Sequence, residues 1–198
     1  WMKKGKAEIV NVYDFWFLAK GKAIPYGIYD INLNKGFVNV GIDHNTSEFA
    51  VESIRQWWDN IGKINYPNAK ELLICADGGG SNASRSRLWK FYLQKFTNKT
   101  RLKLTICHFP PGTSKWNKIE HKMFSFISMN WRGKPLINYE VIINLIEGTK
   151  TKKGLKIKAK IDKNVYELKK KVSDEEFDKI NFERHQINPQ WNYTLSKI

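Results

Sequence analysis

The chain has 198 residues, 41% of them hydrophobic, which is enough to bury the core of one globular domain. Lysine and arginine number 34 against 19 acidic residues, and the formal net charge of +15 favours a polyanionic partner such as nucleic acid. No apolar run reaches the roughly 18 residues of a membrane span and no signal peptide opens the chain, so we expect a cytoplasmic protein with no membrane partner. Cys75 and Cys107 lack the spacing of a zinc site, and we expect them to be reduced thiols in the core.

The chain opens with WMKKGKAEIVNVYDF, which carries no helix or strand start signal. We expect residues 1–22 to be a linker or remnant that follows a missing upstream part. Residues 23–40 contain two β-rich runs, and Asn34 to Gly36 supply the turn between them. This pattern predicts a β-hairpin.

The next elements alternate between helix and strand. Thr46 or Ser47 caps a helix that runs to Gly62, and residues 71–77 form a short apolar run typical of a strand buried on both faces. A second helix over 84–100, with its apolar face through Leu88, Phe91, Tyr92 and Phe96, leads to a second strand over 102–109. The order predicts an α/β fold with one mixed sheet.

A third helix is predicted over residues 115–131, with Trp116, Ile119, Met123, Phe126 and Ile127 on its apolar face. Further on, the sequence becomes rich in lysine. We expect a hairpin there with its turn at residues 162–164, followed by a short helix that begins with the capping box of Ser173 and Glu176. Residues 149–198 would form a small basic appendage.

One acid follows the first buried strand, in the stretch LLICADGGGSN. Asp77 therefore stands at the carboxyl end of a parallel strand, where open α/β sheets collect their reacting groups. Glycines 78–80 can adopt positive φ, and we expect the next helix to point its positive N-terminal end at a bound metal or phosphate. The alternative is a simple turn in which Asp77 caps the helix, because the stretch matches no nucleotide-binding fingerprint.

A second acid lies in the stretch HFPPGTSKWNKIEH. A rigid Pro-Pro-Gly turn ends the strand, and the i, i+3, i+4 spacing would place Asn117, Glu120 and His121 on one face of the following helix. If the two strands are neighbours, Glu120 can converge with Asp77 on a shared cation. The alternatives are a solvated Glu120 paired with a neighbouring lysine and an ordinary surface position for His121.

Two carboxylates on a strongly basic chain point to phosphodiester chemistry. Cleavage and strand transfer proceed by in-line attack on phosphorus, which two divalent ions about 3.5–4 Å apart can catalyse. Mg²⁺ or Mn²⁺ prefers carboxylate ligands. We therefore predict that Asp77 and Glu120 are catalytic residues that bind Mg²⁺ or Mn²⁺.

The order of hairpin, helix, strand ending in Asp, and Glu on a later helix resembles the RNase H-like core of DDE transposases and integrases. The stretches GKAIPYGIYD, ADGGGSNASRSRLWK, HFPPGTSKWNKIEH, FSFISMNWRGKPL and WNYT are similar to the Rhodopirellula-type transposase DDE domain of bacterial insertion sequences. The resemblance covers nearly the whole chain. It implies an RNase H-like mixed sheet flanked by helices, with the partial catalytic core at residues 23–148.

The resemblance matches the second acid of the family's triad to Asp77 and the third to Glu120. The first acid belongs on the first core strand, which we expect upstream of Trp1. The early aspartates that could substitute are Asp14, Asp30 and Asp43. Asp30 suits a structural role beside the hairpin turn. We therefore expect an incomplete metal site in this chain and a two-metal site only in the complete domain. Little or no activity is expected for this chain alone.

For function, the resemblance implies divalent-metal-dependent cleavage and strand transfer of an insertion sequence. Its DNA partner would be double-stranded DNA, both the transposon ends and the target. A second copy of the chain could join it in a synaptic complex. The expected location is the nucleoid of a bacterial cytoplasm. The main alternative is a catalytically inactive RNase H-like remnant that holds DNA by its charge.

Several basic and polar residues flank the two acids, where they can contact DNA phosphates, although each taken singly is also explained as a solvated charge. A denser basic strip between Lys152 and Lys171 would bind flanking DNA. His108 fits a strand-edge residue better than a ligand. The DNA-binding candidates are Arg85, Arg87, Lys90, Lys115, Asn117, Lys118, His121 and Lys122.

Overall fold

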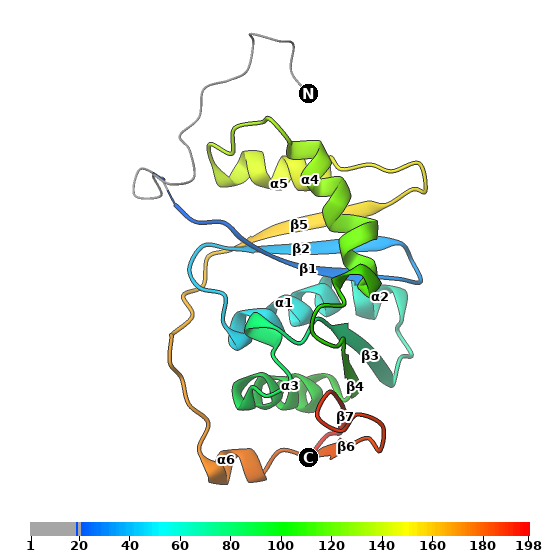
Figure 1. The fold of residues 1–198 in the computed structure, drawn as a ribbon, viewed down its shortest axis with the longest axis vertical. Coiled ribbons are helices and arrows are strands. Elements are labelled where there is room, and N and C mark those ends of the chain that lie inside the picture. Colours follow the sequence, from blue (N-terminus) through cyan, green and yellow to red (C-terminus); the bar gives the residue numbers. More distant parts are fainter. Residues whose placement is uncertain (1–18, 20) are drawn as a thin grey trace. The chain divides into compact units, whose positions relative to one another are not determined.

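The computed structural model describes residue 19 and residues 21–198. They fold as two compact units, each built from two separate segments of the chain (Figure 1). The first unit comprises Trp1–Asp43 and Lys118–Val165, and the second comprises His44–Asn117 and Tyr166–Ile198. Most of the predicted remnant, with Asp14, lies outside the described residues.

A three-stranded sheet in the order β1-β2-β5 forms the base of the first unit. β1 (Ile24–Asp30) and β2 (Lys35–Gly41) are antiparallel and form the predicted hairpin. β5 (Lys156–Asp162) runs parallel to β2, with Lys158 opposite Phe37. The predicted hairpin around residues 162–164 is therefore wrong, because the lysine-rich strand pairs with β2 rather than with the residues that follow it.

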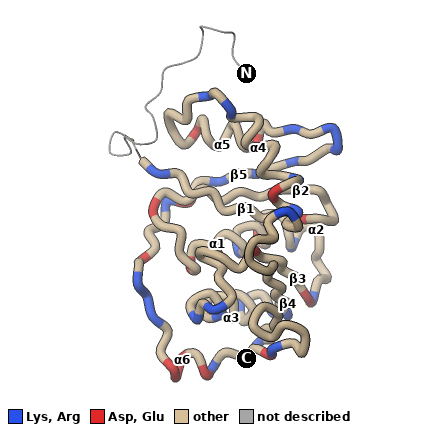
Figure 2. Tube along the Cα trace, viewed as in Figure 1, with Lys and Arg blue, Asp and Glu red and all other residues tan. Residues whose placement is uncertain are grey.

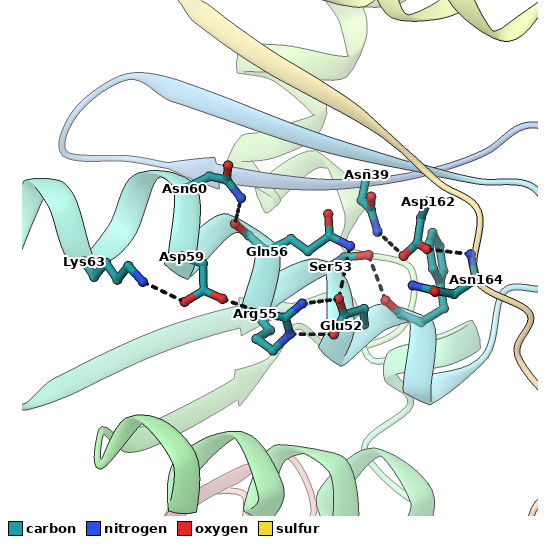
Figure 3. Close-up of polar contacts among 11 residues, drawn as sticks. Asn39, Glu52, Ser53, Arg55, Gln56, Asp59, Asn60, Lys63, Asp162 and Asn164 are labelled. Carbon is teal, nitrogen blue, oxygen red and sulfur yellow. Dashed lines mark hydrogen bonds and ion pairs between the residues drawn. The ribbon is translucent and has the colours of Figure 1, made fainter.

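Two buried aspartates hold the ends of these strands. Asp30 Oδ1 accepts hydrogen bonds from two backbone N–H groups of the hairpin turn, each over 3.0 Å, which confirms its turn-adjacent role. Asp162 accepts from the side chain of Asn39 and from the backbone N–H of Asn164, also over 3.0 Å (Figure 3). Buried carboxylates need such partners, since an unpaired buried charge is costly.

Helices cover one face of this sheet. The π-helix η5 (Glu120–Phe124) continues into α4 (Ser125–Trp131), and α5 (Tyr139–Glu147) begins where the Asn138 side chain accepts a hydrogen bond from the N–H of Val141 over 2.8 Å. Figure 1 shows α4 and α5 on the same side of the sheet. The core between sheet and helices consists of Val38, Val40, Met123, Ile127, Ile142, Ile146, Leu155 and Ile157.

A four-stranded sheet in the order β3-β4-β7-β6 forms the second unit. β3 (Glu71–Ala76) and β4 (Lys103–His108) are parallel, while β7 (Asn192–Leu195) is antiparallel to β4 and to β6 (Phe182–Arg184). The α/β class is confirmed, but the structure has two mixed sheets where the sequence predicted one. The division into a remnant (1–22), a core (23–148) and an appendage (149–198) stays a prediction; the last segment contributes strands to both sheets.

α1 (Ser47–Trp57) begins at the predicted cap, because Thr46 Oγ1 accepts from the N–H of Phe49 over 3.2 Å. It continues as the π-helix η2 (Trp58–Gly62) and the short α2 (Lys63–Asn65). Along this segment Arg55 pairs with Glu52 and Asp59, and Asp59 pairs with Lys63 (Figure 3).

α3 (Arg87–Thr100) packs against α1 and buries Trp89, Leu93 and Phe96. Phe96 is buried as predicted, but Leu88, Phe91 and Tyr92 are only partly buried, because the buried face runs through Trp89 and Leu93 instead. The remaining helical elements are η3 (Gly80–Asn82), η4 (Ser114–Trp116) and α6 (Asp174–Asp178), and α6 has the predicted capping box.

β3 is less buried than its apolar sequence predicts. It lies at the end of the strand order, and alternate side chains point away from the core, so Leu73 is 61% exposed and Cys75 is also exposed. The prediction of a strand buried on both faces is wrong. Both cysteines are free thiols, as predicted, but Cys75 does not belong to the core and Cys107 is only partly buried.

Candidate active site

Asp77 follows β3 directly and is exposed. Its Oδ1 atom accepts hydrogen bonds from the side-chain amide of Asn82 over 2.9 Å and from the N–H of Gly79 over 3.4 Å. Gly78 and Gly80 have φ of 70° and 56°, which confirms the prediction of positive φ for two of the three glycines. The loop therefore folds back so that a residue at its far end orients the carboxylate.

The helix predicted over residues 84–100 is present as α3, and a short turn separates it from the glycines. Residues 80–82 form the turn η3, where Ser47 Oγ donates to the carbonyl of Ser81 over 2.6 Å, and α3 starts only after its cap Ser86. The backbone N–H groups next to Asp77 are thus those of a loop. The expectation that the N-terminal end of α3 points at a ligand bound beside Asp77 stays a prediction.

His108 ends β4 and lies beside this loop. A Cβ atom on Gly78 would sit 3.7 Å from His108 Nδ1, and the N–H of Phe109 donates to the carbonyl of Ala76 over 2.8 Å, extending the pairing of the two strands. Burial and then the nearby Lys90 ammonium lower the pKa of His108, and the Asp77 carboxylate opposes them; together they bring it to about 4. The imidazole is therefore neutral at physiological pH.

Lys90 was predicted to contact DNA, but it is 4% exposed. Its ammonium donates to the carbonyl of Ser84 and lies 5.1 Å from the centre of the Tyr193 ring. Burial, and then the charge of Arg184, lower the pKa of Lys90 to about 8. The structure thus gives Lys90 a place in the core of the second unit, where it does not reach a phosphate.

Glu120 is the first residue of η5 and is exposed. Asn117 has extended backbone (φ −73°, ψ 109°) and precedes this helix, and the i→i+5 bonding of a π-helix widens the turn after Glu120. The predicted common face of Asn117, Glu120 and His121 therefore does not form. Trp116, assigned to the apolar face, is 56% exposed for the same reason.

The helix that carries Glu120 is seated on two glycines of the hairpin. A Cβ atom on Gly27 would lie 2.5 Å from the Phe124 ring and 2.7 Å from Met123, and one on Gly36 would lie 2.4 Å from Met123 Sδ. Only a strand surface without side chains at these two positions lets η5 approach so closely. Glu120 is placed in its unit by this contact.

The other predicted DNA contacts divide into three groups. Arg87 pairs with Asp174 and stacks over the Phe177 ring at 4.8 Å, so it has a structural role. Asn117 is half-buried. The exposed candidates are Arg85, Lys115, Lys118, His121 and Lys122.

Asp77 belongs to the second unit and Glu120 to the first. Among residue 19 and residues 21–198 there is no group of three or more His, Cys, Asp or Glu side chains that could hold a metal ion. Of the early aspartates, Asp30 already accepts hydrogen bonds from the backbone of the hairpin turn.

No helix in the described part of the chain has both the length and the apolar character needed to cross a membrane.

Sequence reasoning missed three residues around Asp77: Asn82, Tyr193 and Trp89. Asn82 stands in the glycine loop itself, where the tendency of asparagine to hydrogen-bond nearby groups is a usable signal. Tyr193 on β7 contacts His108 and accepts a hydrogen bond from Trp89 on α3, and no local pattern in the sequence links these residues.

A mixed α/β chain with an acid at the carboxyl end of a parallel strand and a glutamate on a later helix has the features of a polynucleotidyl transferase domain of the DDE class. A family model for the Rhodopirellula transposase DDE domain matches residues 1–197, and the chain belongs to this family. No curated protein and no solved structure matches the chain. The family confirms the resemblance seen in the sequence and implies a nuclease or strand-transfer function in transposition, with DNA as substrate and a divalent metal as cofactor.

Proposed function

We propose that the chain is the catalytic part of a transposase that cleaves a DNA strand and joins the 3′-hydroxyl end to target DNA, with Asp77 and Glu120 as the acids that hold the metal. The observation that carries this proposal is the state of Asp77. It is an exposed carboxylate at the end of a parallel strand, oriented by Asn82, and it forms no ion pair in the described part of the chain. In so basic a chain, an acid that served stability alone would be expected to pair with a lysine or arginine.

The donor chemistry fits Mg²⁺ or Mn²⁺. Both residues offer carboxylate oxygens, which these hard cations prefer, and like Asp77, Glu120 is exposed and without an ion pair among the described residues. A metal held by these acids would supply the chemistry of activating the attacking oxygen and stabilising the leaving one. The chain's own contribution at Asp77 is orientation: Asn82 engages Oδ1 and leaves Oδ2 open to a ligand.

The positive charge of the chain supports DNA as the substrate. Arg85, Lys115, Lys118 and Lys122 are exposed, and we assign them to phosphate contacts. Figure 2 shows further lysines along the turn before β5 and through the segment after it. These residues would hold the DNA without reading its sequence.

A third acid completes the triad that the family resemblance implies, and we propose that it arrives on a further strand added to β3. In the described residues β3 pairs on one side only, with β4, and its Leu73 is 61% exposed. An open strand edge presents N–H and C=O groups to a new strand. This chain alone is therefore expected to show little or no DNA cleavage, and robust magnesium-dependent nicking by it would overturn that expectation.

The second candidate function is DNA binding without chemistry, by an RNase H-like remnant. The observation that favours it is the lack, in the part of the chain that the structure describes, of any cluster of three metal-binding side chains. Metal binding separates the two functions, because a remnant that binds DNA by charge needs no site for Mn²⁺.

The test is a Mn²⁺ titration followed by electron paramagnetic resonance. Asp77→Asn and Glu120→Gln should each weaken Mn²⁺ binding about tenfold or more. The matched controls Asp178→Asn and Glu140→Gln, at exposed helix positions, should not change it. If both site variants bind Mn²⁺ as the unchanged chain does while DNA binding persists, the remnant function holds instead.

A further inference from the structure

A chain of buried side chains leads to the Asp77 loop. Trp89 on α3 and Tyr193 on β7 are fully buried, and His108 at the end of β4 is 5% exposed. The indole N–H of Trp89 donates to the Tyr193 hydroxyl over 2.9 Å, and that hydroxyl lies 3.1 Å from Nε2 of His108. Three different elements thus contribute one connected polar path.

The direction of each hydrogen bond follows from the donors available. An indole nitrogen can only donate, so the Tyr193 hydroxyl accepts from Trp89. Burial raises the pKa of Tyr193, so its hydroxyl group keeps its proton. This O–H group then donates its hydrogen bond to Nε2 of His108. Nε2 is then an acceptor, and the neutral imidazole carries its hydrogen on Nδ1.

The Nδ1 atom of His108 is buried and has no hydrogen-bond partner among the described residues. A buried donor left unpaired destabilises the fold, so a partner in another state of the protein is expected. The neighbouring backbone is that of Gly78, where an added Cβ would come within 3.7 Å of Nδ1. Asp77 directly precedes this glycine and is the acid whose charge acts on His108.

We propose that His108 is a positioning residue for Asp77: Trp89 and Tyr193 hold its imidazole in the Nδ1–H form, and this N–H donates to the Asp77 carboxylate in the metal-bound and DNA-bound protein. Asn82 and His108 would then orient the carboxylate from two sides. The inference rests on the proposed metal-binding role of Asp77, and it adds Tyr193, from the far end of the chain, to the residues that the site depends on.

The first test is the histidine tautomer, read from long-range ¹H–¹⁵N correlation spectra of the whole 198-residue chain. We expect the Nδ1-protonated pattern for His108, and a mixture of tautomers in Tyr193→Phe. Tyr92→Phe, the same change elsewhere in this unit, should leave the pattern unaltered. An Nε2-protonated His108 in the unchanged chain would overturn the inference whether or not the chain binds metal, so it is distinguishable from failure of the proposed function.

The second test asks whether the donor matters to Asp77. The amide nitrogen of asparagine can occupy the place of Nδ1, so His108→Asn retains the donor while His108→Leu removes it. In a Mg²⁺ titration followed by the amide signals of Gly78 and Gly79, His108→Leu should bind about tenfold more weakly and His108→Asn close to normally. Equal weakening in both folded variants would contradict the positioning role. If the leucine variant fails to fold, the tautomer measurement still decides.

Discussion

The side-chain amide of Asn82 donates to Oδ1 of Asp77 over 2.9 Å, closing a loop in which Gly78 and Gly80 have positive φ. The carboxylate of an exposed aspartate otherwise rotates freely between rotamers. This bond, together with the longer one from the N–H of Gly79, therefore selects the direction in which Oδ2 is presented.

Replacing Asn82 with alanine should weaken Mn²⁺ binding about tenfold, the usual effect of removing a group that orients a metal ligand. The cost in unfolding free energy should be only about 1 kcal/mol, because one partly exposed hydrogen bond is lost. Titration and urea unfolding measure the two effects. Asn60→Ala is the control, since its amide donates over 2.8 Å to the Gln56 carbonyl, and it should not affect Mn²⁺. Equal Mn²⁺ affinity in both variants would remove Asn82 from the site.

Gly27→Ala should destabilise the first unit by about 1–3 kcal/mol, as overpacking of a core does. The new Cβ would come within 2.5 Å of the Phe124 ring, so η5 must shift away from the sheet and take Glu120 with it. Thermal unfolding measures the loss. Gly79→Ala is the control, because a Cβ there meets nothing within 4 Å and its φ is −111°. Unchanged unfolding of the Gly27 variant would mean that η5 does not rest on this glycine.

Lys90 should make stability depend on pH above 8. Its pKa is about 8 in the folded chain against 10.5 ordinarily, so between these values the unfolded chain binds more protons and folding gains stability as the pH rises. Below pH 8 the buried ammonium is a net cost. Lys90→Met should therefore be more stable than the unchanged chain at pH 7, and this advantage should shrink by up to about 3 kcal/mol by pH 10.5. Urea unfolding at several pH values tests this, and a constant difference would contradict it.

Local signals in the sequence predicted the local parts of the fold. The cap at Thr46, the capping box at Ser173 and the hairpin turn each depend on residues a few positions apart, and all three are present. Asp77 was recognisable because an apolar run ends there and glycines follow. These features need no knowledge of what the rest of the chain does.

Local signals could not predict which strands pair when they lie far apart in the chain. The alternation in LKIKAKID predicts a strand, but a turn-like stretch after it favoured a hairpin over the distant partner β2. The helical period predicted for residues 115–131 holds for Met123 and Ile127, which lie in the core, but not for Trp116, because a break at Asn117 separates Trp116 from the helix. The path from Trp89 to His108 exists only because β7 pairs with β4, placing Tyr193 opposite Ile106.

The lysines of β5 should carry part of the DNA affinity. Lys156, Lys158 and Lys160 are exposed and alternate with inward-facing residues, so they present a row of charge at strand spacing. Each phosphate contact contributes about 0.9 to the slope of log K against log salt concentration. Replacing all three with glutamine should lower that slope by about 2 to 3, measured by fluorescence anisotropy with duplex DNA at several salt concentrations.

A matched triple variant provides the control for this charge change. Arg55, Lys63 and Lys103 are each paired with an acid, at 2.5, 3.2 and 3.5 Å, and their replacement with glutamine removes the same formal charge. Because these cationic groups already have carboxylate partners, the slope should change by less than 1. Equal slopes for the two triple variants would mean that DNA responds to net charge alone and that β5 does not contact it.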